Sequence, residues 1–313
     1  MSILSQPHFH NEEAAYEYVE AKLWPKGAVC PRCNETERVG KMGGKSTRIG
    51  VYKCYVCRKP FTVKIGTIFE ASHIKMNIWL QAIYLISSSK KGISSNQLHR
   101  TLGVTLKSAW FMSHRIREAM KDHTGLLGGG GSVVEVDETF IGGKSKKKAK
   151  GARGYHHKDK ILSLVERGGR ARSFHVPSIS SKVIFPILKE HIARDTHINT
   201  DEGSNYVHVA QNKENESRPL EKIFDKHSFI KHSRGEYVRG NVTTNTIEGF
   251  FSIFKRGMRG VYQHCGTQHL NRYLAEFDFR YSERAANGVN DTERADKLLC
   301  GVVGKLLTYQ TVN

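Results

Sequence analysis

The sequence is short of acidic residues and of proline. Its 30 Asp and Glu stand against 49 Lys and Arg, so the formal net charge is +19 and a partner rich in negative charge is indicated. Only 7 prolines occur among 313 residues, of which 38% are hydrophobic, and this composition excludes collagen-like and largely disordered chains. We therefore expect a globular protein of two or three structural units.

Membrane and secretion signals are also lacking. No apolar run reaches the roughly 18 residues that a membrane-spanning helix needs, and the best one, Ile78–Ile86, is interrupted by Gln81. The first 25 residues do not follow the basic-then-apolar order of a signal peptide. We expect the chain in the cytoplasm, associated with the nucleoid, and we expect no membrane partner.

Four of the six cysteines form two CxxC pairs, Cys30 with Cys33 and Cys54 with Cys57. Each pair can present two thiolates to one metal, and two pairs complete the tetrahedral coordination of zinc. We expect structural Zn²⁺ in a small β-ribbon over residues 28–70, because so short a segment cannot bury a core alone. The alternative is two redox or disulfide pairs, which belong in secreted chains. Such a ribbon binds nucleic acid, binds protein or braces a neighbouring domain.

A basic pair of helices is predicted within residues 74–124, after an N-terminal helix in residues 1–27. One helix spans about residues 95–102, and a second begins after Thr105, as in a helix-turn-helix. Residues 90–117 hold six Lys or Arg and no acid, so the second helix can enter a major groove. The residues predicted to contact DNA there are Lys107, Arg115 and Arg117. The alternative is a basic helical hairpin that does not bind DNA.

The pattern changes to β structure after residues 125–131, which contain four consecutive glycines and are predicted to be a linker. Beyond it, strands and one helix alternate in the order of an α/β domain. The predicted strands cover residues 132–141, 160–166, 170–176 and 197–200, and the helix covers residues 181–194. Asp137 lies within the first strand and Asp201 directly follows the fourth, although Asp is a poor strand residue.

A further helix, within residues 243–258, has an apolar face and a polar face. Its apolar face holds Ile247, Phe250, Phe251, Phe254 and Met258, and its polar face holds Asn245, Glu248, Ser252 and Lys255. Asp137, Asp201 and Glu248 together offer the hard carboxylate oxygens, from three separate elements, that two divalent cations need for phosphoryl transfer. The alternative for the polar face is a solvated surface with a weak Glu248–Lys255 ion pair.

Read in order, these motifs resemble the DDE transposases and integrases, and in particular the zinc-ribbon transposases of bacterial insertion sequences, the ISXO-like group. The resemblance extends over about residues 15–285 and includes VDETFIGGK at 136–144 and TNTIEGFFSIFKRGMRGVYQH at 244–264. It implies a ribonuclease H-like catalytic core of α/β class, a mixed β-sheet with flanking helices. This core would occupy residues 132–285, preceded by the zinc ribbon and the helix-turn-helix.

The resemblance also implies the ligands of the catalytic metals. Asp137 and Asp201 would bind two Mg²⁺ or Mn²⁺ ions, with Glu248 as the third carboxylate. Asn245 matches a position where some members have Asn as the third signature residue, although a carboxylate binds Mg²⁺ better than an amide does. Glu135 points to the same side of its strand as Asp137 and could assist it.

Lys255 and His264 match basic positions of the family, and the resemblance implies that both position phosphates. Between residues 141 and 172 lie eleven Lys or Arg against two acids, and the candidates for gripping DNA in that segment are Lys146, Lys147, Lys148 and Lys150. The alternative is a solvated loop that orders only on binding.

The function expected is that of an insertion-sequence transposase. It would bind the terminal inverted repeats and target DNA, work as a homo-oligomer on DNA, and catalyse metal-dependent strand cleavage and strand transfer. Two alternatives stay open: a metal-dependent nuclease of the same fold, and a DNA-binding regulator without enzymatic activity. Residues 286–313 form a C-terminal tail to which the sequence assigns no role.

Overall fold

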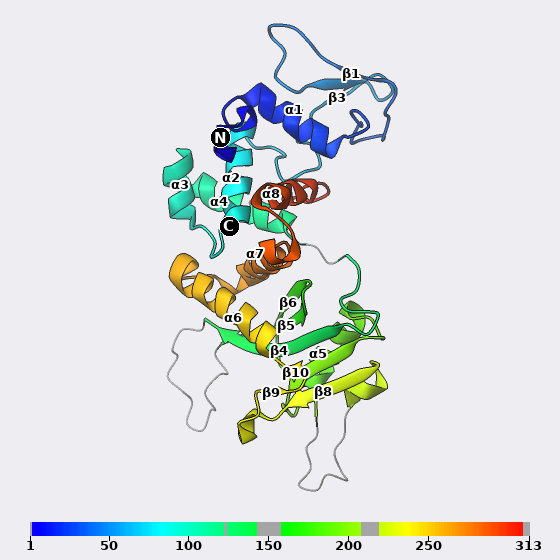
Figure 1. Cartoon of the computed structure of the whole chain (residues 1–313). Helices are drawn as coiled ribbons and strands as arrows, with labels where there is room; N and C mark the ends of the chain where they lie inside the picture. Colours follow the sequence, from blue (N-terminus) through cyan, green and yellow to red (C-terminus); the bar gives the residue numbers. More distant parts are fainter. Residues whose placement is uncertain (1, 122–123, 143–157, 208–218, 309–313) are drawn as a thin grey trace. The chain divides into compact units, whose positions relative to one another are not determined.

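The protein is described by a computed structural model in which the chain divides into two units (Figure 1). Unit 1 takes residues 1–122 and 289–313, and unit 2 takes residues 123–288, so unit 2 is an insertion in the chain of unit 1. The described residues are 2–121, 124–142, 158–207 and 219–308. The four lysines predicted to grip DNA lie outside the described residues.

Unit 1 contains a small antiparallel sheet and a group of packed helices. Its strands are β1 (Val39–Lys41), β2 (Tyr52–Cys54) and β3 (Pro60–Phe61). Its α-helices are α1 (Glu12–Leu23), α2 (Met76–Ser88), α3 (Ser95–Leu102), α4 (Leu106–Ala119) and α8 (Asp291–Cys300). Helix α2 contacts each of the other four, and α8 also contacts α1. The tail that the sequence left without a role therefore packs into the core of unit 1, where Leu298 and Leu299 are buried.

Helix α3 spans the residues that the sequence predicts, and α4 begins directly after Thr105, as predicted. Gly103 ends α3 in the left-handed conformation at φ 66°, which glycine adopts at little cost. Thr105 caps α4 by accepting a 3.1 Å hydrogen bond from the backbone N–H of Ser108. Ala109, Met112 and other apolar residues at helical spacing are buried. The paired helices are confirmed, and their contact with DNA is a separate question.

Unit 2 is built around a mixed five-stranded sheet in the order β6-β5-β4-β7-β8. Its strands are β4 (Val133–Ile141), β5 (Asp159–Glu166), β6 (Ala171–Val176), β7 (His197–Asp201) and β8 (Lys226–Ile230). Its α-helices are α5 (Ser181–His191), α6 (Asn245–Gly257) and α7 (Leu270–Ser282). β4, β5 and β6 are antiparallel, whereas β4, β7 and β8 are parallel. The expectation of a mixed sheet with flanking helices is confirmed.

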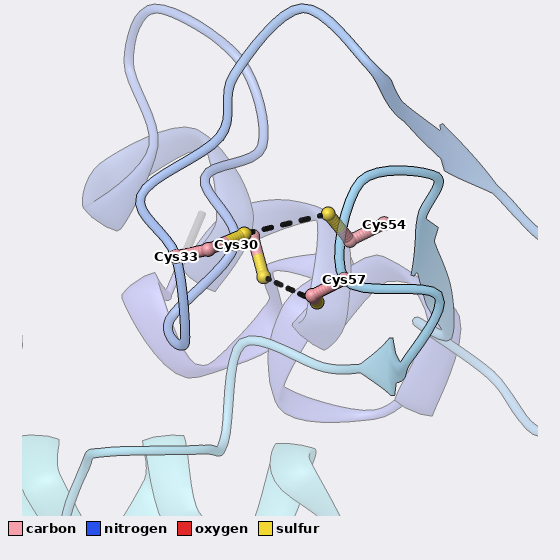
Figure 2. Close-up of side chains that lie close together, drawn as sticks. All are labelled: Cys30, Cys33, Cys54 and Cys57. Carbon is pink, nitrogen blue, oxygen red and sulfur yellow. Dashed lines mark hydrogen bonds between the residues drawn. The ribbon is translucent and has the colours of Figure 1, made fainter.

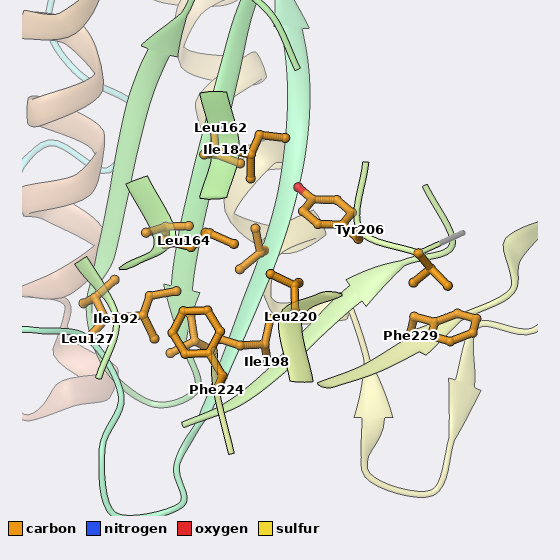
Figure 3. Packing of buried hydrophobic residues seen from close by; sticks show 14 of the residues in the cluster. Leu127, Leu162, Leu164, Ile184, Ile192, Ile198, Tyr206, Leu220, Phe224 and Phe229 are labelled. Atoms are coloured by element: carbon orange, nitrogen blue, oxygen red, sulfur yellow. The ribbon is translucent and has the colours of Figure 1, made fainter. Parts of the chain in front are cut away.

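Each face of this sheet has its own hydrophobic core. Val134 and Val136 of β4 pack with Leu188 of α5 on one face. Figure 3 shows other members of this core, among them Ile184 of α5 and Ile198 of β7. On the other face, Ile161 of β5 packs with aromatic residues of α6 and α7, among them Phe254. Because side chains alternate along a strand, Glu135 and Asp137 of β4 point toward the opposite face, which α6 and α7 cover.

The glycine-rich segment, which the sequence analysis interprets as a linker, is a hydrogen-bonded loop of unit 2. Leu127 is completely buried and forms a parallel bridge with Ile192. The backbone N–H groups of Gly129 and Gly130 donate to Thr196 Oγ1 and Asp195 Oδ2 at 2.9 and 2.7 Å. All four glycines have positive φ, so they supply the conformation that this packed loop requires.

Three further features differ from the sequence predictions. The helix α5 ends at His191 rather than at residue 194. Strand β8 was not predicted. The hairpin of β9 (Val238–Arg239) and β10 (Val242–Thr243) was not predicted either. Within the described residues, every helix is too short or too polar to cross a membrane.

Candidate active site and zinc centre

Asp137 and Asp201 occupy neighbouring positions on two parallel strands. The register pairs residues 133–135 of β4 with residues 197–199 of β7. When this register is continued by two residues, Asp137 falls beside Asp201. β7 ends at Asp201, whereas β4 continues to Ile141. The two aspartates therefore lie at the end of β7, beyond which β4 has no parallel partner strand along that edge.

Both aspartates face the helix α6. Val134, Val136 and Ile198 belong to the core on the α5 face, so the alternation of side chains directs Asp137 and Asp201 to the opposite face. α6 covers that face with Ile247, Phe250 and Phe254 buried against the sheet, as its predicted apolar face requires. The first turn of α6 carries Glu248.

A cavity of about 540 Å³ joins these elements. Its lining residues are Asp137, Glu138, Thr139, Asp201, His232, Tyr237, Glu248, Phe251, Ser252 and Lys255. The structure thus brings together four of the six residues for which the sequence analysis expects a catalytic role, namely Asp137, Asp201, Glu248 and Lys255. Asn245 and His264 are exposed and do not line this cavity.

Short hydrogen bonds hold the two aspartate side chains. Oδ1 of Asp137 accepts from the backbone N–H of Glu138 at 2.7 Å, and Oδ1 of Asp201 accepts from the backbone N–H of Gly203 at 2.8 Å. A Cβ at residue 203 would lie only 2.8 Å from Oδ1 of Asp201. Glycine at this position therefore allows the backbone to approach the carboxylate closely.

Burial and neighbouring acids raise the pKa of two carboxyl groups that line the cavity. Burial, followed by the charges of Asp201 and Glu138, raises the pKa of Asp137 to about 8. Burial raises the pKa of Glu138 to about 7, with a further contribution from Asp201, although the hydrogen bond from Tyr206 acts in the opposite direction. Packing several acids in a partly buried site is costly without a cation, so the donor set suits a divalent metal ion.

The carboxylates of the cavity are suitable ligands for such an ion, but their oxygens are not close enough together to share one. Three ligands of one Mg²⁺ lie within about 4.2 Å of one another, because each Mg–O distance is about 2.1 Å. Among the described residues, no three carboxylates place their oxygens within 4.8 Å of one another. Glu248, whose side chain is 50% exposed, has room to move. Binding of one ion by all three acids therefore requires their side chains to draw together.

Two lining residues, His232 and Tyr237, were missed by the sequence analysis. Nε2 of His232 lies 3.9 Å from Oε1 of Glu248, and its ring centroid lies 5.4 Å from that of Tyr237. Glu202 holds this segment, because its carboxylate accepts from the backbone N–H and the hydroxyl of Ser233 at 2.7 and 2.9 Å. The segment contains no recognisable motif. Only Gly235 and Gly240, both at positive φ, marked turns there.

Glu135 does not assist Asp137 as a ligand. Its side chain is 0% exposed and it does not line the cavity. Its carboxylate accepts hydrogen bonds from Arg167 and from the start of α6. Alternation along β4 placed it correctly on the same face as Asp137, but its contacts are with protein groups.

The four paired cysteines form a site suited to zinc. All four sulfur atoms lie within 4.8 Å of one another, although the two pairs are separated in the sequence (Figure 2). Sγ of Cys30 lies 3.7 Å from Sγ of Cys57, and Sγ of Cys33 lies 3.6 Å from Sγ of Cys54. Tetrahedral ZnS₄ with Zn–S of about 2.3 Å has S–S edges of about 3.8 Å. The donor set therefore fits Zn²⁺ in both chemistry and geometry.

The side chains of two predicted DNA-contacting residues are buried. Arg115 is 5% exposed, and its Nη1 donates to the carbonyls of Ile68 and Glu70 at 2.7 Å each. Arg117 is 1% exposed, and its Nη1 donates to Ser113 Oγ at 3.1 Å. The expectation that these arginines meet phosphates is wrong for this structure, because both guanidinium groups are bound inside unit 1. Lys107 is exposed.

Known proteins match both units of the chain. A family described as the ISXO2-like transposase domain matches residues 126–282, a range that includes β4, α6 and every lining residue of the acid cavity. The chain belongs to the ISXO2-like transposase family. A second family, the transposase zinc-ribbon domain, matches residues 10–60, which include all four paired cysteines. The resemblance inferred from the sequence is confirmed, and the four clustered sulfurs support structural Zn²⁺.

A relative from Halobacterium salinarum carries the name "Uncharacterized protein in transposable element ISH50". It is 26% identical over 290 residues, which cover 87% of this chain and 91% of that protein. The similarity thus extends through both units, and the relative's name places it in a mobile element. These matches establish a DDE-type transposase family.

Proposed function

We propose that this ISXO2-like transposase cleaves DNA strands at the ends of an insertion sequence and joins them to target DNA at the acid cavity of unit 2. The observation that carries this proposal is that Asp137, Asp201, Glu248 and Lys255, from three separate elements, line one cavity. Three carboxylates and an ammonium group suit phosphoryl transfer, since the acids can hold cations and the lysine can bind a phosphate.

Asp137, Asp201 and Glu248 would hold two Mg²⁺ or Mn²⁺ ions. When bound, such ions lower the pKa of an attacking water or 3′-hydroxyl and stabilise the charge on the phosphate. Glu248 is preferred to Asn245 as the third ligand, because Glu248 lines the cavity and Asn245 does not. His264 does not line the cavity either, so Lys255 is the residue proposed to position the phosphate.

Recognition of the terminal inverted repeats is assigned to unit 1. The ribbon and the α3–α4 pair would contact DNA, with Lys107 at the start of α4 as the exposed basic residue. The net charge of +19 supports a polyanionic partner. We further propose that Lys146, Lys147, Lys148 and Lys150 bind DNA backbone, that unit 2 is a ribonuclease H-like core, and that the protein forms a homo-oligomer on paired ends.

The test is an in vitro reaction with a labelled terminal repeat, a target plasmid, and Mg²⁺ or Mn²⁺. Asp137→Asn, Asp201→Asn and Glu248→Gln should each abolish cleavage and joining while DNA binding persists. Asn245→Ala, the matched change three residues from Glu248, should retain both steps. Activity in Glu248→Gln with loss in Asn245→Ala would reassign the third ligand, and full activity in every variant would remove the active site from this cavity.

The same reaction separates the two alternatives. A metal-dependent nuclease would produce hydrolysed ends and no joined product. A DNA-binding regulator would produce neither, although it would still bind the terminal repeat. The transposase is supported only when cleaved ends and joined product appear together and both depend on Asp137 and Asp201.

A further inference from the structure

The helix that carries Glu248 receives one cap from its own chain segment, since Thr243 Oγ1 accepts from the backbone N–H of Asn245 at 3.1 Å. Thr244 is the N-cap residue of α6, but its side chain accepts no hydrogen bond from the first turn. Its hydroxyl instead donates to Oε1 of Glu248 at 3.0 Å. The first turn of a helix exposes unpaired N–H groups and the positive end of the helix dipole, so another acceptor must serve them.

Glu135 of β4 supplies that acceptor from a distant part of the chain. Its Oε2 accepts from the backbone N–H of Ile247 at 3.0 Å, and its Oε1 accepts from Thr246 Oγ1 at 3.0 Å. Glu135 is completely buried and lies two residues before Asp137. One strand therefore carries both the first proposed metal ligand and the cap of the helix that carries the third.

Arg167 completes the connection. Its Nε donates to Oε1 of Glu135 at 2.7 Å, which balances the buried negative charge. Its Nη1 donates to the carbonyl and the side-chain oxygen of Asn241 at 2.7 and 2.9 Å, and its Nη2 donates to the carbonyl of Thr243 at 3.1 Å. The guanidinium group thus ties the segment that leads into α6 to the same carboxylate.

We propose that Glu135 and Arg167 are positioning residues for the reaction, which hold Glu248 at a set distance from Asp137. The proposal rests on the function proposed above. Glu135 touches no lining residue's carboxylate and acts through the first turn of α6. Because the acids must draw together to share a cation, a displaced first turn of α6 weakens cation binding before it affects DNA binding.

The primary variant is Glu135→Gln, which keeps the size of the side chain and one acceptor but removes the charge. Mn²⁺ binding to the purified full-length chain is measured by the electron paramagnetic resonance signal of free Mn²⁺. We expect a loss of about 10–100-fold in Mn²⁺ affinity, the range found when groups that orient metal ligands are altered. The kcat for cleavage should fall by a similar factor, while KM for the terminal-repeat DNA stays unchanged.

Asp278→Asn is the matched control. Asp278 is also a buried carboxylate that joins a helix to a strand, since its two oxygens accept from the backbone N–H and the hydroxyl of Ser173 at 2.7 Å each. It lies on α7, its hydrogen bonds go to Ser173 of β6, and it does not line the acid cavity. This variant should alter stability and leave both Mn²⁺ affinity and kcat as in the wild type. A purely structural role for Glu135 would make the two variants behave alike.

Arg167→Gln and the double variant Glu135→Gln/Arg167→Gln test whether the effects of Glu135 and Arg167 on Mn²⁺ binding are coupled. If Arg167 works through Glu135, the double variant should lose less Mn²⁺ affinity than the two single losses combined, because each single change leaves the other charged group unpaired and the double change leaves neither. Fully additive losses would show that Arg167 acts separately and would overturn its part of the proposal.

Thr246→Val serves if Glu135→Gln does not fold, since it removes one hydrogen bond to Glu135 and keeps the charged pair. We expect a smaller but measurable drop in Mn²⁺ affinity, and unchanged affinity and kcat in that folded variant would overturn the proposal. Asp201→Asn distinguishes a failure of the positioning proposal from a failure of the proposed function. If it loses Mn²⁺ binding and cleavage while Glu135→Gln retains both, positioning is wrong and the proposed function stands. If the wild type neither binds Mn²⁺ nor cleaves, the proposed function fails.

Discussion

The hydroxyl of Tyr206 donates a 2.6 Å hydrogen bond to Oε1 of Glu138, the neighbour of Asp137 in the sequence. Tyr206 is completely buried, and its burial and the charge of Glu138 raise the pKa of Tyr206 far above its usual value. The tyrosine therefore keeps its proton at neutral pH and serves as a donor to Glu138. Glu138 is one of several acids in the cavity, and this bond compensates part of the cost of burying it.

Tyr206→Phe should accordingly destabilise unit 2. Removal of the hydroxyl leaves a buried carboxyl oxygen without its donor, which costs about 1–3 kcal/mol of the free energy of unfolding. Urea unfolding followed by circular dichroism measures the change. Tyr237→Phe is the control, because Tyr237 is 62% exposed and its hydroxyl has water available. Equal stability of the two variants would contradict the role given to the Tyr206 hydroxyl.

Gly128→Ala should disrupt the ordered loop that precedes β4. A Cβ at residue 128 would lie 2.2 Å from Thr196 Oγ1, and φ is 76° at this residue. Gly131→Ala is matched to it, since φ there is 74° and a Cβ would meet nothing within 4 Å. Both variants pay about 1 kcal/mol for the left-handed conformation, but only Gly128→Ala should also lose hydrogen-exchange protection at Leu127. A flexible linker would tolerate both changes equally.

Zinc content should depend on the paired cysteines alone. The wild type is expected to hold one zinc per chain, and Cys54→Ser should abolish it, because Cys54 is a buried member of the four-sulfur cluster. Residues 28–70 should then become sensitive to limited proteolysis, since zinc binding contributes folding energy. Cys300→Ser, which changes an exposed thiol of the same unit, should retain one zinc by mass spectrometry. Retention of zinc in Cys54→Ser would refute the site.

Substitution of Arg115 should change the stability of the protein, whereas substitution of Lys107 should change its DNA binding. Arg115→Met removes a guanidinium group that serves buried carbonyls, so the free energy of unfolding should fall by about 2–4 kcal/mol. The salt dependence of DNA binding by the folded variant should stay as in the wild type. Lys107→Ala should leave stability nearly unchanged and reduce the slope of log K against log salt by about 1. A reduced slope in Arg115→Met would place that arginine on DNA after all.

Asp278 should make stability depend on pH near neutrality. Burial raises the pKa of Asp278 to about 7, against the smaller opposing effects of the Ser173 hydrogen bonds and Arg172. A raised pKa in the folded state contributes stability that is complete below the unfolded pKa of about 3.9 and is lost as pH rises through 7. The full difference is about 4 kcal/mol at most.

Asp278→Asn does not titrate, so its stability relative to the wild type should rise between pH 4 and pH 7 and level off above. Urea unfolding of both proteins at several pH values measures this difference. A difference that is constant over the whole interval would show that Asp278 keeps an ordinary pKa in the folded protein.

Local signals explain which parts of the fold could be predicted. The cap at Thr105, the Gly103 turn and the apolar face around Phe250 are short-range features, and the elements they define are confirmed. Strand β8 depends on parallel pairing with β7, which no local pattern shows. The segment after β8 carries His232 and Tyr237, so those two cavity residues were missed with it.

The candidate site likewise has features that could be predicted from the sequence and features that could not. Asp137 and Glu248 could be found because alternation in a strand and helical spacing define which face each residue occupies. The burial of Arg115 could not be predicted, because the carbonyl groups that accept its hydrogen bonds include those of residues 68 and 307, which are far away in the sequence. The partners of Glu135 are likewise as far away as Arg167 and Ile247. Charge and periodicity indicate which groups are available, and only tertiary contacts decide which of them reach solvent.

The packing of α8 on α1 and α2 has a consequence for how the protein matures on the ribosome. Unit 2 leaves the exit tunnel before residues 291–300 do, because it precedes them in the chain, and domains generally fold as they emerge. Unit 1 begins first but cannot close its core until α8 has left the exit tunnel. A nascent chain, or one trimmed before Asp291, therefore holds a finished unit 2 and an unfinished unit 1. The order of folding is in this respect the reverse of the order of synthesis.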